Sequence, residues 1–230
     1  RVDPEHSRYK RLELIETYEF HNPSYETFIY DLDRRVKPTP DSMVYSVCWI
    51  TRHVNEIFTL DEGQLEKGPL LRKPLLQVNN QSQRLKHGYS LLVRQLSLDE
   101  PAFRFWEAMK GNSQEMTGMF DRQPSLTPSN ICNLEDPGEI VLGFFSVSGV
   151  TEKRIFVKDV AGLYLPDLPF CTPAAEPPRL RFMLPEDLPI FMAERETEFG
   201  TTRSEIPHRC VDCRLYPHSS AVPPEFWKTK

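Results

Sequence analysis

The chain has 230 residues, of which 39% are apolar and 27% are charged, and its formal net charge is −5. These values are ordinary for a folded globular protein and exclude a disordered chain. Lysine and arginine are mixed with aspartate and glutamate along the whole length, so we expect no nucleic-acid partner, which would need a basic stripe to neutralise its phosphates. No apolar run approaches the roughly 20 residues of a membrane-spanning helix, and the first residues lack the character of a signal peptide.

Strands are the first elements that the pattern predicts along the chain. Residues 9–20 place apolar side chains at even positions between charged ones, which is typical of a half-buried strand. Short runs of β-branched and aromatic residues predict further strands at 43–49, 55–60 and 88–96.

A helix is predicted directly after the last of these strands. Residues 97–100 fit a capping box, and Phe103 and Trp106 follow at helical spacing until Gly111. Either Ser97 or Asp99 can be the N-cap; with Asp99, the following proline lies in the first turn, where its missing N–H costs nothing. A second candidate helix, with a proline inside it, covers 185–199.

A hairpin and long proline-rich connections complete the predicted elements. Residues 140–148 and 152–158 are rich in strand-forming residues and are joined through a short turn at 149–151, which predicts an antiparallel hairpin. The 21 prolines against 10 glycines indicate many irregular connections, the longest at 166–178. We therefore expect a β-rich α+β fold, with antiparallel strands, one or two helices and long proline-rich loops, as a single domain over 1–230.

An ordered set of short motifs gives the chain a family resemblance. The motifs are Cys48-Trp49, Leu96-Ser97-Leu98-Asp99-Glu100, Phe105-Trp106, Phe120-Asp121-Arg122-Gln123-Pro124, Ser129-Asn130-Ile131, Asp136-Pro137, Val141-Leu142-Gly143-Phe144-Phe145, Lys153-Arg154-Ile155-Phe156 and Cys210-Val211-Asp212-Cys213-Arg214. In this order, over about residues 9–227, the chain resembles the outer-membrane lipoproteins of the Bacteroidota grouped as domain of unknown function 4249 (DUF4249). It departs from the pattern at Ser129, where glycine is common, so a positive φ there would be costly.

The resemblance implies a location and a partner and carries no catalytic residues or cofactors. It implies a non-enzymatic cell-surface lipoprotein, acting as accessory or ligand-capture subunit of an outer-membrane TonB-dependent transporter, with a peptide or glycan as candidate ligand. A purely structural subunit of a larger outer-membrane assembly is the alternative, and a hydrolase with an unrecognised site is a third. The chain begins with Arg1 and is expected to be a carboxy-terminal portion, the family's β-sandwich and lipid anchor lying upstream.

Five cysteines are the main candidate site residues: Cys48, Cys132, Cys171, Cys210 and Cys213. In the oxidising location that the resemblance implies, we expect disulfides. Cys171 is predicted to pair with Cys210 or Cys213, because a crosslink would hold the proline-rich tail to the body. Cys48 is predicted to pair with Cys132, since each lies beside a family motif. The alternative is a zinc site in His208-x-Cys210-x2-Cys213-x4-His218, which supplies four ligands at short spacing.

Other groups of polar and aromatic residues are interpreted as structural. The carboxylate pairs Asp31/Asp33 and Glu135/Asp136 lie in polar segments, where such spacing is typical of solvated turns. The six histidines are scattered without a partner pattern. The aromatic residues Tyr25, Phe28 and Tyr30 can form a ligand platform or a core, and the core is favoured because aromatic side chains carry much of the burial energy of β-rich domains.

Overall fold

A computed structural model describes residues 7–65, 74–115, 129–165, 168–198 and 200–227. The chain forms two compact units, and neither is a continuous stretch of sequence. The first unit takes its residues from 1–16, 53–77 and 91–155, and the second from 17–52, 78–90 and 156–230. The described part is rich in β-strands with antiparallel pairing and one long helix, as the sequence predicts.

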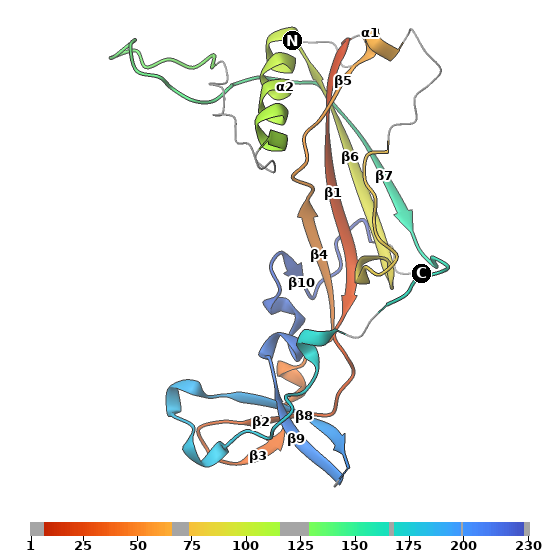
Figure 1. Ribbon diagram of the computed structural model, residues 1–230, viewed down its shortest axis with the longest axis vertical. Coiled ribbons are helices and arrows are strands. Elements are labelled where there is room, and N and C mark those ends of the chain that lie inside the picture. Colours follow the sequence, from red (N-terminus) through yellow and green to blue (C-terminus); the bar gives the residue numbers. More distant parts are fainter. Residues whose placement is uncertain (1–6, 66–73, 116–128, 166–167, 199, 228–230) are drawn as a thin grey trace. The chain divides into compact units, whose positions relative to one another are not determined.

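The larger sheet has the strand order β10-β4-β1-β6-β7, with β5 also pairing to β1 (Figure 1). Its strands are β1 (Tyr9–His21), β4 (Val47–His53), β5 (Phe58–Asp61), β6 (Gly88–Leu98), β7 (Val150–Val157) and β10 (Ser219–Ser220). The predicted strands at 9–20 and 88–96 match β1 and β6. The predicted runs at 43–49 and 55–60 correspond to β4 and β5, each displaced by a few residues.

In the first unit, a helix contacts the start of the chain's first strand. Helix α2 (Glu100–Glu115) begins at Asp99, whose Oδ1 accepts a hydrogen bond from the Ala102 N–H at 2.9 Å. Asp99 is therefore the N-cap, and Pro101 lies in the first turn. Phe103 stacks on Tyr9 of β1 with ring centroids 4.6 Å apart. The short helix α1 (Glu62–Leu65) follows β5, whose pairing with β1 joins Tyr9 to Asp61 in register.

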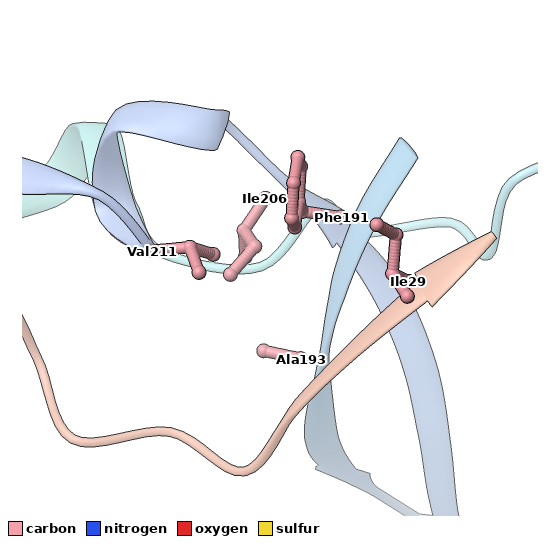
Figure 2. Packing of buried hydrophobic residues seen from close by; sticks show 5 residues of the cluster. All are labelled: Ile29, Phe191, Ala193, Ile206 and Val211. Carbon is pink, nitrogen blue, oxygen red and sulfur yellow. The ribbon is translucent and has the colours of Figure 1, made fainter. Parts of the chain in front are cut away.

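In the second unit, a smaller antiparallel sheet has the order β3-β2-β8-β9. Its strands are β2 (Thr27–Tyr30), β3 (Val36–Pro38), β8 (Ile190–Thr197) and β9 (Gly200–Ile206). Because successive side chains alternate between faces, the sheet has apolar clusters on both sides. One cluster holds Ile29, Phe191, Ala193, Ile206 and Val211 (Figure 2). The other holds Phe28, Tyr30, Ile190 and Met192.

This alternation decides the role of the predicted aromatic group. Tyr25 packs against the cluster around Phe191, whereas Phe28 and Tyr30 belong to the opposite cluster. The three rings are thus divided between the two faces of one sheet. They are core residues, and they do not form a common ligand platform.

Two predicted elements are wrong. Residues 140–149 form no strand, so the expected hairpin is missing and β7 begins only at Val150. The candidate helix at 185–199 is instead a 3-10 turn, Pro185–Asp187, followed by β8. The run Phe191–Ala193 is paired on both sides, by β2 and by β9, and this tertiary pairing overrides the local helical pattern.

Short 3-10 helices occupy several of the irregular connections. They lie at Asp41–Met43, Gln83–Leu85, Pro169–Cys171, Leu180–Phe182, Pro185–Asp187, His208–Cys210 and Cys213–Leu215. Four of them begin at or directly after a proline, whose fixed φ suits the start of a helix.

Candidate functional site

Two disulfides crosslink the second unit. Cys171 is bonded to Cys210, one of the two partners expected for it. Cys48 is bonded to Cys213 instead of the expected Cys132, which is exposed and free. The cysteines of the zinc alternative therefore belong to two different disulfides, and their thiolates are not available to a metal.

Residues 211–214, which adjoin the bonded Cys210 and include the bonded Cys213, make further local contacts. Val211 packs in the core, and Asp212 caps the turn after it by accepting a hydrogen bond from the Arg214 N–H at 2.9 Å. The Arg214 guanidinium also donates to both carboxylate oxygens of Asp212 and lies 3.5 Å from the centre of the Tyr45 ring. These contacts hold the pKa of Asp212 below its usual value, the hydrogen bond from Arg214 being the largest cause. The motif Cys210–Arg214 therefore has a structural role: it carries two disulfide cysteines, a core residue and a capped turn.

The carboxylate pairs are turn residues, as the sequence indicates. Asp31 and Asp33 both bind the Lys37 ammonium, at 2.6 and 3.0 Å. The hydrogen bond from Lys37 is the largest cause of the lowered pKa of Asp31. Asp136 accepts a hydrogen bond from the Gly138 N–H at 3.0 Å, and both Glu135 and Asp136 are exposed. Neither pair has the surroundings of an acid–base dyad.

Residues 129–148 form an exposed segment of the first unit, which we call the arm. Figure 1 shows it as a green, extended segment that reaches away from α2. Its base is closed by Asn130, whose side-chain amide donates to the Phe145 carbonyl at 2.7 Å and accepts from the Phe145 N–H at 2.8 Å. Beyond Asn130, six large apolar side chains are exposed: Ile131, Leu134, Ile140, Leu142, Phe145 and Val147.

A pocket of about 510 Å³ lies where the arm meets the start of α2. Phe144 stacks on Phe105 of the helix with ring centroids 5.0 Å apart. The polar groups around these rings include Asn130 and two charged helix residues, Glu100 and Arg104. Glu100 and Arg104 are themselves an ion pair, with Arg104 Nη2 2.5 Å from Glu100 Oε1. This mixture of aromatic faces and polar groups suits the binding of a segment of peptide or sugar.

The fold of the second unit brings together three potential metal ligands, one of which is far from the other two in the sequence. Glu19, His21 and His87 lie together, each half-buried. Glu19 and His21 are two residues apart on β1 and so share a face, and His87 directly precedes β6, the neighbour of β1 in the sheet. Burial lowers the pKa of His87, the charges of His21 and Lys86 lower it further, and Glu19 acts to raise it. The Glu-x-His spacing at the end of the strand predicted over 9–20 is the one signal in the sequence.

Comparison with known proteins places the chain in a family. A family model described as "Domain of unknown function (DUF4249)" matches residues 4–154, about two thirds of the chain. The match includes the arm and ends before the Cys210–Arg214 motif. No curated protein and no solved structure matches. Among the described residues, no helix is both long and apolar enough to cross a membrane. The chain belongs to the DUF4249 family.

Proposed function

We propose that the chain is a non-enzymatic accessory or ligand-capture subunit that binds an outer-membrane β-barrel transporter of the TonB-dependent type through its arm. The observation that carries the proposal is the row of exposed apolar side chains on the arm, of which Leu134 is 90% exposed and Leu142 71%. Six exposed large apolar side chains on one segment of 20 residues make the arm a candidate interaction surface, because large apolar patches on a protein surface mark interaction sites. Burying such side chains against a partner is favourable by roughly 25 cal/mol per Å².

The shape of the arm supports a protein partner. Two backbone-mimicking hydrogen bonds hold its base at Asn130 and Phe145, and side-chain-capped turns at Asn133 and Asp136 shape its tip. The apolar side chains are therefore presented on a segment that is held at both ends. A pre-arranged segment loses less conformational entropy on binding, which favours affinity.

The disulfides support the proposed location. Protein disulfides persist in oxidising compartments and are rare in the cytosol, and four of the five cysteines are bonded. Such a compartment agrees with a position at the cell surface of the outer membrane, held by a lipid anchor upstream of this chain. The pocket at the base of the arm is the proposed place for a peptide or glycan ligand.

The test is co-purification of the full-length protein from gently solubilised membranes of its native host, with the partner identified and quantified by mass spectrometry. We expect a TonB-dependent barrel at near-equal amounts with the wild type. The double variant Leu142→Ser, Val147→Ser should lose most of the barrel, whereas Phe182→Ser, which removes an equally exposed apolar side chain from the second unit, should retain it.

Two results would contradict the proposal: a wild-type protein that purifies alone, or an arm variant that keeps its barrel. Calorimetry with peptides and glycans then separates the two roles. Heat of binding that is lost on Phe144→Ala supports ligand capture, and binding of the barrel without any ligand supports the purely structural role.

A further inference from the structure

The side chains of Glu19, His21 and His87 form a compact group of three metal-ligand atoms. Their ligand atoms all lie within 4.8 Å of one another. His21 Nε2 is 2.7 Å from Glu19 Oε1, and the two imidazole rings are stacked, with centroids 3.6 Å apart and planes inclined by 12°. Two histidines and one carboxylate in such proximity are a common ligand set of zinc and other divalent transition metals.

A pocket opens beside this group. It has a volume of about 350 Å³, and both histidines line it together with Asn22, Ser24 and Lys86. Such a volume is many times that of one water molecule, so it has room for an ion with its remaining water ligands.

Asn22 is a second, independent feature of this pocket. The side chain is only 7% exposed, its Nδ2 donates to the Arg209 carbonyl at 2.9 Å, and its Oδ1 has no hydrogen-bond partner among the described residues. A buried acceptor without a donor is unfavourable, because the loss of its hydrogen bonds to water is not compensated. That oxygen is covered by protein atoms, so a water molecule in the pocket would reach it only if the Asn22 side chain moved.

We propose that Glu19, His21 and His87 bind a divalent transition-metal ion, with zinc as the best match to two imidazole nitrogens and one carboxylate oxygen. Three protein ligands leave at least one coordination position for water or a small ligand, and the adjacent pocket has room for it. The site belongs to the second unit and the arm to the first. The proposal is therefore independent of the role of the arm, and each can fail without the other.

Binding requires the imidazole rings to turn. A metal ion lies in the plane of each imidazole that ligates it, because the nitrogen lone pair points along that plane. Two rings inclined by only 12° and stacked face to face cannot both direct a lone pair at one ion. At least one ring must rotate about its χ2 torsion, which is broad for histidine. Zinc should therefore separate the stacked rings, and this separation is measurable.

The test is zinc titration of the oxidised protein by calorimetry at neutral pH, after treatment with a chelator. Every variant carries Cys132→Ser, so that the free thiol cannot bind the ion. We expect one zinc per chain in the parent. His21→Ala, His87→Ala and Glu19→Gln should each weaken binding by about tenfold or more. The matched controls are His53→Ala, an exposed histidine of β4, and Glu13→Gln on β1; both should bind zinc like the parent.

Further measurements keep the outcomes distinct. Circular dichroism without metal checks that each variant folds, and Co²⁺ added in place of zinc reports the ligand geometry by its visible absorption. In NMR spectra, zinc should shift the ring protons of His21 and His87 as the stacking is lost. The proposal is overturned if the parent binds no zinc, or if the controls weaken binding as much as the three ligand variants. Binding that survives Glu19→Gln overturns the three-ligand site and leaves two histidines only.

Discussion

Removing the Cys48–Cys213 disulfide should destabilise the protein more than removing Cys171–Cys210, because it closes the longer loop. The bonded residues are 165 and 39 positions apart. In the chain-entropy description, closing loops of these lengths restricts the unfolded chain by about 5 and about 4 kcal/mol. The difference between them, about 1.3 kcal/mol, depends only on the ratio of the loop lengths.

Other contributions to this difference are small. All four bonded cysteines are almost completely buried, at 2% exposure or less, so replacing them by alanine leaves voids of similar size. The shorter loop lies inside the longer one. With the inner bond intact, the outer loop is effectively shortened, which lowers its contribution by only about 0.2 kcal/mol. The order of the two effects is therefore a firm expectation.

The assay compares two double variants by urea unfolding. One is Cys48→Ala with Cys213→Ala, and the other is Cys171→Ala with Cys210→Ala. Both also carry Cys132→Ser. Trp49 and Trp227 are buried in the second unit with ring centroids 6.5 Å apart, so near-ultraviolet circular dichroism follows the unit that both bonds crosslink. Equal losses in the two double variants, or a larger loss for the shorter loop, would refute the entropic reasoning. A parent whose midpoint is unchanged by reductant would refute the pairing itself.

Two further changes test local contacts. Asp99→Ala should cost about 1 kcal/mol in urea unfolding, because it removes the oxygen that caps α2, while Asp99→Ser should retain most of the stability; equal losses would contradict the cap. Asp212→Asn should be less stable than the parent at neutral pH. Because the folded-state pKa of Asp212 is depressed, this stabilisation is present above the unfolded pKa, near 3.9, and is lost as the pH falls through the folded value. A difference in unfolding free energy between Asp212→Asn and the parent that persists in strong acid would contradict this reasoning.

The sequence predicts those elements whose signals are local. β1 is marked by its alternating pattern, although residues 14–18 are buried on both faces, and α2 is marked by its cap, by Pro101 in its first turn and by Phe103 at helical spacing. The signals fail where a distant segment decides. Residues 191–193 are a strand because β2 and β9 pair with them. The arm has the composition of a strand but gains no pairing partner within the described chain.

The candidate sites depend even more on distant contacts. The pairing of Cys48 with Cys213 follows from the backbone hydrogen bonds that join Tyr45 to the chain at 211–213, and no spacing rule could supply them. Likewise, Glu19 and His21 are placed on one face by the period of β1, which the sequence predicts. The histidine that completes the group is 66 positions away and arrives only because β6 lies beside β1 in the sheet. The sequence can therefore predict the local pair of this ligand set but not the third residue, which comes from beside the neighbouring strand. For this reason the histidines look scattered in the sequence.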